Sequence, residues 1–144
     1  MVLLPRRFGF TLIELLIVMA IIAILAAISI FALSGARESA RDSARKAQLE
    51  EIRSLLELYR SDCGTYPTAL EFPSPGDPFV GTCPNNITYK EEMPGDPLPG
   101  RQYSYTPAAP PNSYILCAAL EGDTTLAAGC GNCGETCSYL VTNP

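Results

Sequence analysis

The stretch that decides the fold is residues 1–33, MVLLPRRFG followed by FTLIELLIVMAIIAILAAISIFAL. A short leader with the basic residues Arg6 and Arg7 ends at Gly9, and the apolar run that follows contains a single acidic residue, Glu14. A carboxylate inside a bilayer costs roughly 2.5–3.5 kcal/mol on insertion scales, and such an acid usually has a function. We therefore expect Glu14 to have a partner that compensates its charge.

The apolar run covers residues 10–33, which is 24 residues, and about 20 are enough to cross a hydrocarbon core. Basic residues precede the run, which favours an N-terminus in the cytoplasm and the remainder of the chain outside. A cleavable secretory signal is the alternative, but its apolar part has only about 7–15 residues and is followed by small residues at the cleavage site. Here the run is longer and its small residues lie inside it. We expect a retained membrane-spanning and assembly helix over 10–34.

The helical pattern continues beyond the membrane over residues 35–61, where apolar residues recur every three or four positions. No proline lies between Pro5 and Pro67. Gly64 follows the pattern directly and is a typical helix end. We expect one helix from Phe10 to about Ser61, whose outer half docks on its own tail or on a neighbour through an apolar stripe: Ala40, Ala44, Ala47, Leu49, Ile52, Leu55, Leu56 and Tyr59.

The remainder, residues 62–144, contains 12 of the 13 prolines. Residues 67–100 are punctuated by proline, which is typical of loops. Three later stretches have the composition of strands: Gln102–Thr106, Ser113–Leu120 and Ser138–Thr142. Three strands alone are only marginally stable, so we expect the tyrosines to pack the sheet on the helix. The predicted fold is α+β, with a long N-terminal helix against a small antiparallel sheet, and the sheet belongs to a disulfide-rich region at 62–144.

All six cysteines lie after the apolar run, at Cys63, Cys83, Cys117, Cys130, Cys133 and Cys137. An even number in a small domain that leaves the cytoplasm indicates a disulfide framework. Six cysteines allow 15 pairings, and the sequence does not choose among them. The alternative is a metal site, because residues 130–137 have ligand-like spacing. One such cluster without histidine is a weak zinc signal.

Charge and composition exclude several functions. The net charge is −5, and residues 62–144 carry only Lys90 and Arg101 against nine acidic residues. Nucleic-acid affinity depends largely on a basic surface, so we expect no direct nucleic-acid binding. Histidine is absent, and no serine, histidine and aspartate set, phosphate loop or paired-carboxylate cleft can be assembled. We expect neither an enzyme nor a resident cofactor.

The glycine, the phenylalanine and the glutamate five residues on resemble the class III signal peptide of type IV pilins and type II secretion pseudopilins, over about 25 residues from Arg6 to Ala27. A looser resemblance to the major pseudopilin and to small pilins lies at Tyr66-Pro67, Gly95-Asp96-Pro97 and Tyr103-Ser-Tyr105. The resemblance implies the type IV pilin fold. It also implies that a prepilin peptidase removes residues 1–9 by cutting between Gly9 and Phe10, and that the new amine of Phe10 is methylated.

In that family, Glu14 would meet the N-terminus of a neighbouring subunit as it enters a helical filament. The resemblance implies a homo-oligomer that starts as a single-pass inner-membrane precursor and ends as an extracellular or periplasmic filament. Its assembly partners would be the peptidase, a platform protein and, indirectly, an ATPase. The expected function is a structural subunit of a type IV pilus, for attachment, motility or DNA uptake; the alternative is a pseudopilin that drives protein export.

Two further hypotheses concern ligands. No calcium loop like that of the major pseudopilin can be identified in this sequence, although Glu121, Asp123 and Glu135 could supply oxygen ligands to calcium. The simpler expectation is that these acidic side chains are solvated and that disulfides hold their loop in place. A membrane-anchored binding module with a metal held by the cysteine cluster is a third functional class.

Overall fold

A computed structural model describes residues 9–69, 71–83 and 86–143, and the rest of the predicted leader, including Arg6 and Arg7, lies outside these residues. The chain divides into two compact units, residues 1–37 and residues 38–144. We call the second unit the head. The element order is one helix followed by five strands.

The helix α1 spans Leu12–Cys63, which is 52 residues. It begins two residues after the predicted start and ends two residues after the predicted end. Gly64 follows its last residue with a φ of 79°, and the Gly64 N–H donates to the carbonyl of Arg60 at 2.8 Å. A left-handed glycine directly after the last turn is the expected helix stop, so the predicted C-terminus of the helix is confirmed.

Three of the strands form the predicted antiparallel sheet, in the order β3-β4-β5. These strands are β3 Ser104–Pro107, β4 Tyr114–Ala118 and β5 Tyr139–Thr142. Ser104 pairs with Cys117 in the first ladder, and Cys117 pairs with Leu140 in the second. The three strand predictions are confirmed, with ends that differ by at most two residues.

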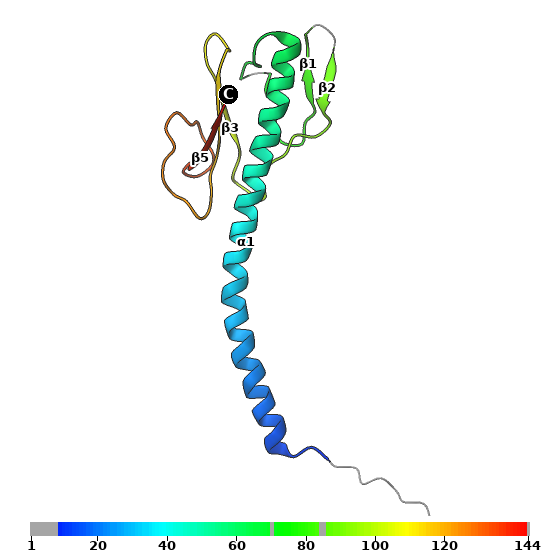
Figure 1. The fold of residues 1–144 in the computed structure, drawn as a ribbon, viewed down its shortest axis with the longest axis vertical. Coiled ribbons are helices and arrows are strands. Elements are labelled where there is room, and N and C mark those ends of the chain that lie inside the picture. Colours follow the sequence, from blue (N-terminus) through cyan, green and yellow to red (C-terminus); the bar gives the residue numbers. More distant parts are fainter. Residues whose placement is uncertain (1–8, 70, 84–85, 144) are drawn as a thin grey trace, which may run out of the picture. The chain divides into compact units, whose positions relative to one another are not determined.

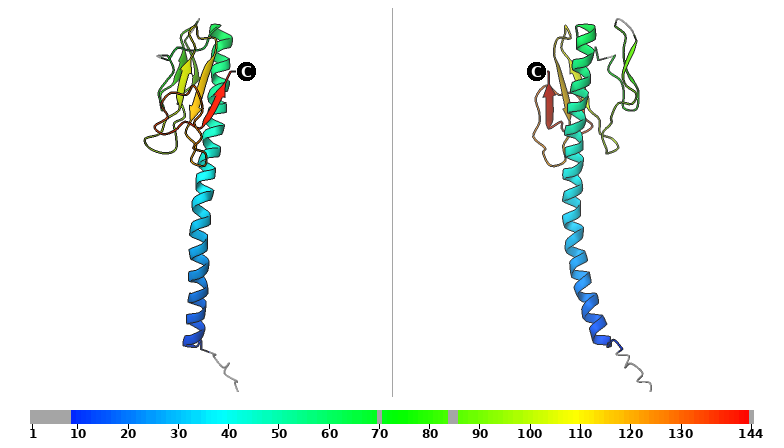
Figure 2. Two further views of the ribbon diagram at one scale, coloured as in Figure 1. Left: turned by 90° about the vertical axis from the view of Figure 1, so that its left-hand side faces the viewer. Right: turned by 45° about the vertical axis from the view of Figure 1, so that its right-hand side comes forward.

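A second, two-stranded sheet corrects the prediction that residues 67–100 form only loops. The strands β1 Phe79–Gly81 and β2 Ile87–Lys90 pair antiparallel. In the head, this hairpin and the three-stranded sheet lie on either side of α1 in Figure 1, and both lie toward one face of it in the left view of Figure 2. The surrounding prolines hide these two short strands from a periodicity analysis.

The core of the head lies between the helix and the strands. Side chains of α1 such as Leu49, Ile52 and Leu56 belong to one buried cluster with Leu116 and Tyr114 of β4. The tyrosines do pack the strands on the helix, as expected: Tyr59 and Tyr66 are buried in this cluster, and Tyr89, Tyr103, Tyr105 and Tyr139 pack against it.

The beginning of the predicted apolar stripe is wrong. Ala40, Ala44 and Ala47 are exposed, and the buried position on this part of the helix is taken by Arg45, which has 0% relative exposure. The small alanine side chains offer little apolar area, whereas a guanidinium group can be buried when carboxylates surround it. The stripe is apolar only from Leu49 onward.

Candidate functional site

The first candidate site is the start of α1, where Glu14 is paired within its own chain. The N–H and the hydroxyl of Thr11 each donate to Oε2 of Glu14 at 2.8 Å, and the N–H of Glu14 donates to Oγ1 of Thr11 at 3.3 Å. This reciprocal pairing is a capping box, which satisfies free N–H groups of the first helical turn. The T-x-x-E spacing of residues 11–14 is the sequence signal for this box, although the expectation for Glu14 did not include it.

The two residues on either side of the predicted cleavage point are accessible. Gly9 and Phe10 are exposed, and Phe10 retains 86% of its surface. A Cβ added at Gly9 would meet nothing within 4 Å. The backbone between them is therefore open to an enzyme, and a small substitution at Gly9 has room in the structure.

The apolar part of α1 lacks partners within the described chain. Every side chain from Gly9 to Ile30 is exposed, including Leu12 at 80% and Ile30 at 69%. The helix is long and apolar enough to cross a membrane. A contiguous apolar surface of this size marks a membrane or a protein interface.

The second candidate site is a cluster of ion pairs in the head that joins α1 to two distant segments. Arg45 donates through Nε and Nη2 to both oxygens of Asp96 at 2.8 and 2.9 Å, and both side chains have 0% exposure. Nη1 of Arg45 donates to Asp42 and to Glu121, each at 2.7 Å. Arg41 donates to the same Glu121 through Nε at 2.7 Å.

Hydrogen bonds shift the pKa values of the ionisable groups in this cluster. Hydrogen bonds from Arg41, and then from Arg45, lower the pKa of Glu121 to about 2. Burial would raise the pKa of Asp42, but hydrogen bonds from the N–H groups of Glu121 and Gly122 and from Arg45 outweigh it and lower that pKa. The bidentate bond to Asp96 raises the pKa of Arg45. Glu121 and Asp42 are therefore ionised and Arg45 is protonated at neutral pH. The hydrogen bonds of Arg45 fasten the helix to the loops at Asp96 and Glu121.

Sequence reasoning missed this cluster, although one signal was available. Arg37, Arg41 and Arg45 are spaced four residues apart, and like charges at that spacing repel on a helix. Carboxylates must offset such a row, and Asp42 supplies only one of them from the helix itself. The others, Asp96 and Glu121, lie 51 and 76 residues from Arg45, so no local pattern identifies them.

The donor set around the calcium candidates does not fit calcium, which takes 6–8 oxygen ligands. Both oxygens of Glu121 accept from arginines. Asp123 accepts from the N–H of Thr125 at 2.9 Å, and Glu135 pairs with Arg101. In the part of the chain that the structure describes, no group of three or more His, Cys, Asp and Glu residues is placed to hold a metal ion.

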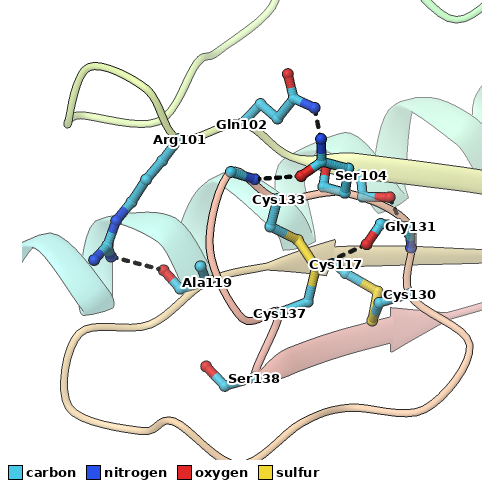
Figure 3. Close-up of a disulfide and its surroundings, with 12 residues drawn as sticks. Arg101, Gln102, Ser104, Cys117, Ala119, Cys130, Gly131, Cys133, Cys137 and Ser138 are labelled. Atoms are coloured by element: carbon cyan, nitrogen blue, oxygen red, sulfur yellow. Dashed lines mark hydrogen bonds between the residues drawn. A yellow bond between two sulfur atoms is a disulfide. The ribbon is translucent and has the colours of Figure 1, made fainter.

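The six cysteines form three disulfides, and none is free. The pairs are Cys63–Cys83, Cys117–Cys130 and Cys133–Cys137. The last two lie close together, as Figure 3 shows, and form a second small core with Ala119. Because Cys130, Cys133 and Cys137 are all bonded to sulfur, they have no thiolate to offer to a metal.

Backbone hydrogen bonds fasten this disulfide loop to the start of the sheet. The N–H of Gln102 donates to the carbonyl of Cys133 at 3.0 Å, and the N–H of Gly131 donates to Oγ of Ser104 at 3.1 Å (Figure 3). The outer face of β4, which carries Cys117, is therefore covered by the chain's own loop.

Comparisons with known proteins agree with these observations. Residues 4–30 match the prokaryotic N-terminal methylation motif. Residues 32–125, which are more than half of the chain, match the family model of the type II secretion system (T2SS), protein G. No solved structure matches the chain.

A curated relative is the type IV wide pilus major component PilA4 of Thermus thermophilus, with 52% identity over 58 residues. The alignment covers 40% of this chain and 44% of the relative. The chain thus spans less than half the length of the curated relative that it matches.

Proposed function

The chain belongs to the family of the type II secretion system protein G, and we propose that it is a structural subunit of a type IV pilus. In this proposal it polymerises through its N-terminal helix into an extracellular filament that serves attachment, motility or DNA uptake. The single observation that carries the proposal is the apolar helix surface, exposed at every described position from Gly9 to Ile30, directly after a methylation motif. The similarity to a pilus component in Thermus thermophilus supports a pilus.

The proposal assigns a different role to each part of the chain. Residues 1–9 are a leader that a prepilin peptidase removes, and the new amine of Phe10 is methylated. Residues 10–34 are the membrane and assembly helix, residues 35–61 continue it into the head, and residues 62–144 form the disulfide-rich outer part. The role is structural rather than catalytic.

Glu14 is proposed to form an ion pair with the amine of Phe10 on a neighbouring subunit. Both groups are costly in an apolar medium, and pairing reduces the cost for both. The amine does not exist until the leader is cut, so cleavage must come before assembly. Because Thr11 already donates two hydrogen bonds to Glu14, the neighbour's amine must add to that pairing or replace it.

The location changes with assembly. The precursor is a single-pass inner-membrane protein with its N-terminus in the cytoplasm, and the assembled subunit is outside the cell. A platform protein in the inner membrane and, indirectly, a cytoplasmic ATPase would drive the transfer. The disulfides suit an oxidising compartment outside the cytoplasm.

The test is electron microscopy of filaments sheared from the cell surface, with the subunit identified by mass spectrometry. We expect long filaments composed of this chain, and we expect their loss when its gene is deleted. Surface filaments that lack this chain, and that persist after the deletion, would contradict the proposal.

A second candidate function is a pseudopilin of a type II secretion system, and the match of residues 32–125 to the protein G family favours it. Deletion of the gene distinguishes the two. A pseudopilin is required for the export of a secreted protein and forms no long surface filaments, whereas a pilin is required for the filaments while export continues.

A further inference from the structure

Three carboxylates from different segments of the head meet at the guanidinium group of Arg45. Asp42 lies on α1, Asp96 lies in the loop between β2 and β3, and Glu121 follows β4. Arg45 has 0% exposure and donates to all three of them, with Nε and Nη2 on Asp96 and Nη1 on the other two. A single buried cation therefore joins the helix to two loops that are far from it in the sequence.

The segment after β4 is bound to α1 in both directions. The N–H groups of Glu121 and Gly122 both donate to Asp42, each at 2.9 Å. The carboxylate of Glu121 in turn accepts from Nε of Arg41 and from Nη1 of Arg45, each at 2.7 Å. Backbone donors and a side-chain acceptor of one short segment are thus fixed by three side chains of the helix.

The three carboxylates need a cation between them, because like charges that share a site repel one another. Here two arginines bring two positive charges to three carboxylates. A single calcium ion would bring the same positive charge, and calcium is the ion that the resemblance to the major pseudopilin would imply. Calcium takes 6–8 oxygen ligands, but both oxygens of Glu121 already accept from Arg41 and Arg45. A calcium ion at Glu121 would have to displace the arginines.

A guanidinium group suits this junction better than a free ion does. It is planar, always charged and more weakly hydrated than an ammonium group, and its donors form a rigid fork that matches a carboxylate. Arg45 uses that fork on Asp96, at 2.8 and 2.9 Å, where both side chains have 0% exposure. Because the group is attached to α1, its local concentration at the carboxylates does not depend on the ions in the medium.

We propose that Arg41 and Arg45 supply, from within the chain, the cation that this junction needs, in place of a calcium ion. The two guanidinium groups tie the segment after β4 to α1, and the folded head requires no divalent cation. The inference goes beyond the proposed function, because it concerns the head of a single chain and holds for a pilin and for a pseudopilin alike.

The first test is thermal unfolding of the full chain in detergent, followed by near-UV circular dichroism, with either calcium chloride or the chelator EGTA in the buffer. We expect the same melting temperature in both buffers, because the carboxylates are already bound to arginines. A lower melting temperature in EGTA that added calcium restores would overturn the proposal.

The second test is chemical rescue of Arg45→Ala, which removes the buried cation and leaves space for a small one. We expect this variant to melt below the wild type. Guanidinium chloride, at concentrations far below those that unfold proteins, should raise its melting temperature relative to sodium chloride at the same ionic strength. The wild type and Arg53→Ala should show no such rise, since the ion pair of Arg53 with Glu50 is partly exposed. An Arg45→Ala chain that guanidinium does not stabilise would overturn the proposal.

Arg41→Ala replaces Arg45→Ala in this experiment if the latter does not fold. The side chain of Arg41 retains 32% exposure, so its removal should lower the melting temperature less. We again expect a rise with guanidinium and none with sodium, and the absence of that rise would contradict the proposal. Both tests use the purified chain without filaments, so a failure here leaves the tests of the proposed function unchanged.

Discussion

Arg45 is fully buried, and carboxylates from three segments surround its guanidinium group. Removing one partner of a buried ion pair leaves an uncompensated charge, here Asp96 with 0% exposure. We predict that Arg45→Met lowers the free energy of unfolding by about 3–5 kcal/mol. Arg53→Met is the matched control, because the ion pair of Arg53 with Glu50 is partly exposed and should be worth about 0–1 kcal/mol. Denaturant titration of the full chain in detergent, followed by near-UV circular dichroism, measures both; equal losses would contradict the role of Arg45.

Gly9 is exposed and has space for a methyl group. A failure to process Gly9→Ala would therefore reflect recognition by the peptidase and not misfolding. We predict that Gly9→Ala accumulates with its leader attached, as shown by the intact mass of the membrane-bound chain. Gly35→Ala is the control, since Gly35 also has open space and should still be cut. Normal trimming of Gly9→Ala would refute the assignment of the cleavage point.

At the scale of the elements, two glycines with positive φ allow two costs of substitution to be compared. One is the backbone strain alone, and the other is the same strain together with a steric clash. Gly64 directly follows the end of α1 with a φ of 79°, and a Cβ added there would have nothing within 4 Å. Gly134 has a φ of 82°, and a Cβ added there would lie 2.1 Å from the carbonyl oxygen of Gly100. We predict a loss of about 1 kcal/mol for Gly64→Ala. Gly134→Ala should lose clearly more, because the disulfide loop must move away from the backbone before β3. Thermal unfolding of the two variants tests this order of stability loss. Equal melting temperatures would contradict it.

The junction between α1 and the segment after β4 should be sensitive to acid. The pKa of Glu121 is about 2 in the folded chain, against an ordinary value of 4.5. Its contribution to stability is therefore complete above about pH 4.5 and is lost as the pH falls toward 2. We predict that the free energy of unfolding decreases over this window, and that Glu121→Gln flattens the decrease while lowering stability at pH 7. An unchanged slope in the variant would show that other carboxylates dominate.

The sequence predicted elements whose signals are local. The apolar run and Gly64 define α1, and the strand-like composition of three stretches after residue 101 locates the three-stranded sheet. Contacts between distant residues were not predictable in the same way. The pairing of Arg45 with Asp96, the choice among 15 cysteine pairings and the short strand β1 beside Pro78 all depend on the folded arrangement.

On the scale of the whole molecule, the two units differ in how their apolar side chains are covered. The head has its own core, held by three disulfides and an ion-pair cluster. The apolar helix segment has no such cover, and each described side chain from Gly9 to Ile30 is exposed. Lipid covers this surface in the membrane-anchored precursor, and helices of other subunits would cover it in a filament. Glu14 lies within this surface, and under the proposed function it is the residue that a filament would accommodate better than a bilayer would.

The most direct test of assembly through the N-terminal helix is the length and number of surface filaments made by the Glu14→Ala variant, with Ser29→Ala as the control in the same segment. Ser29 donates only to the carbonyl of Leu25 in its own helix, so the control should assemble normally. We predict that Glu14→Ala is still processed but stays in the membrane, and that its filaments are lost. Filaments of normal length and number from a processed Glu14→Ala chain would contradict the account.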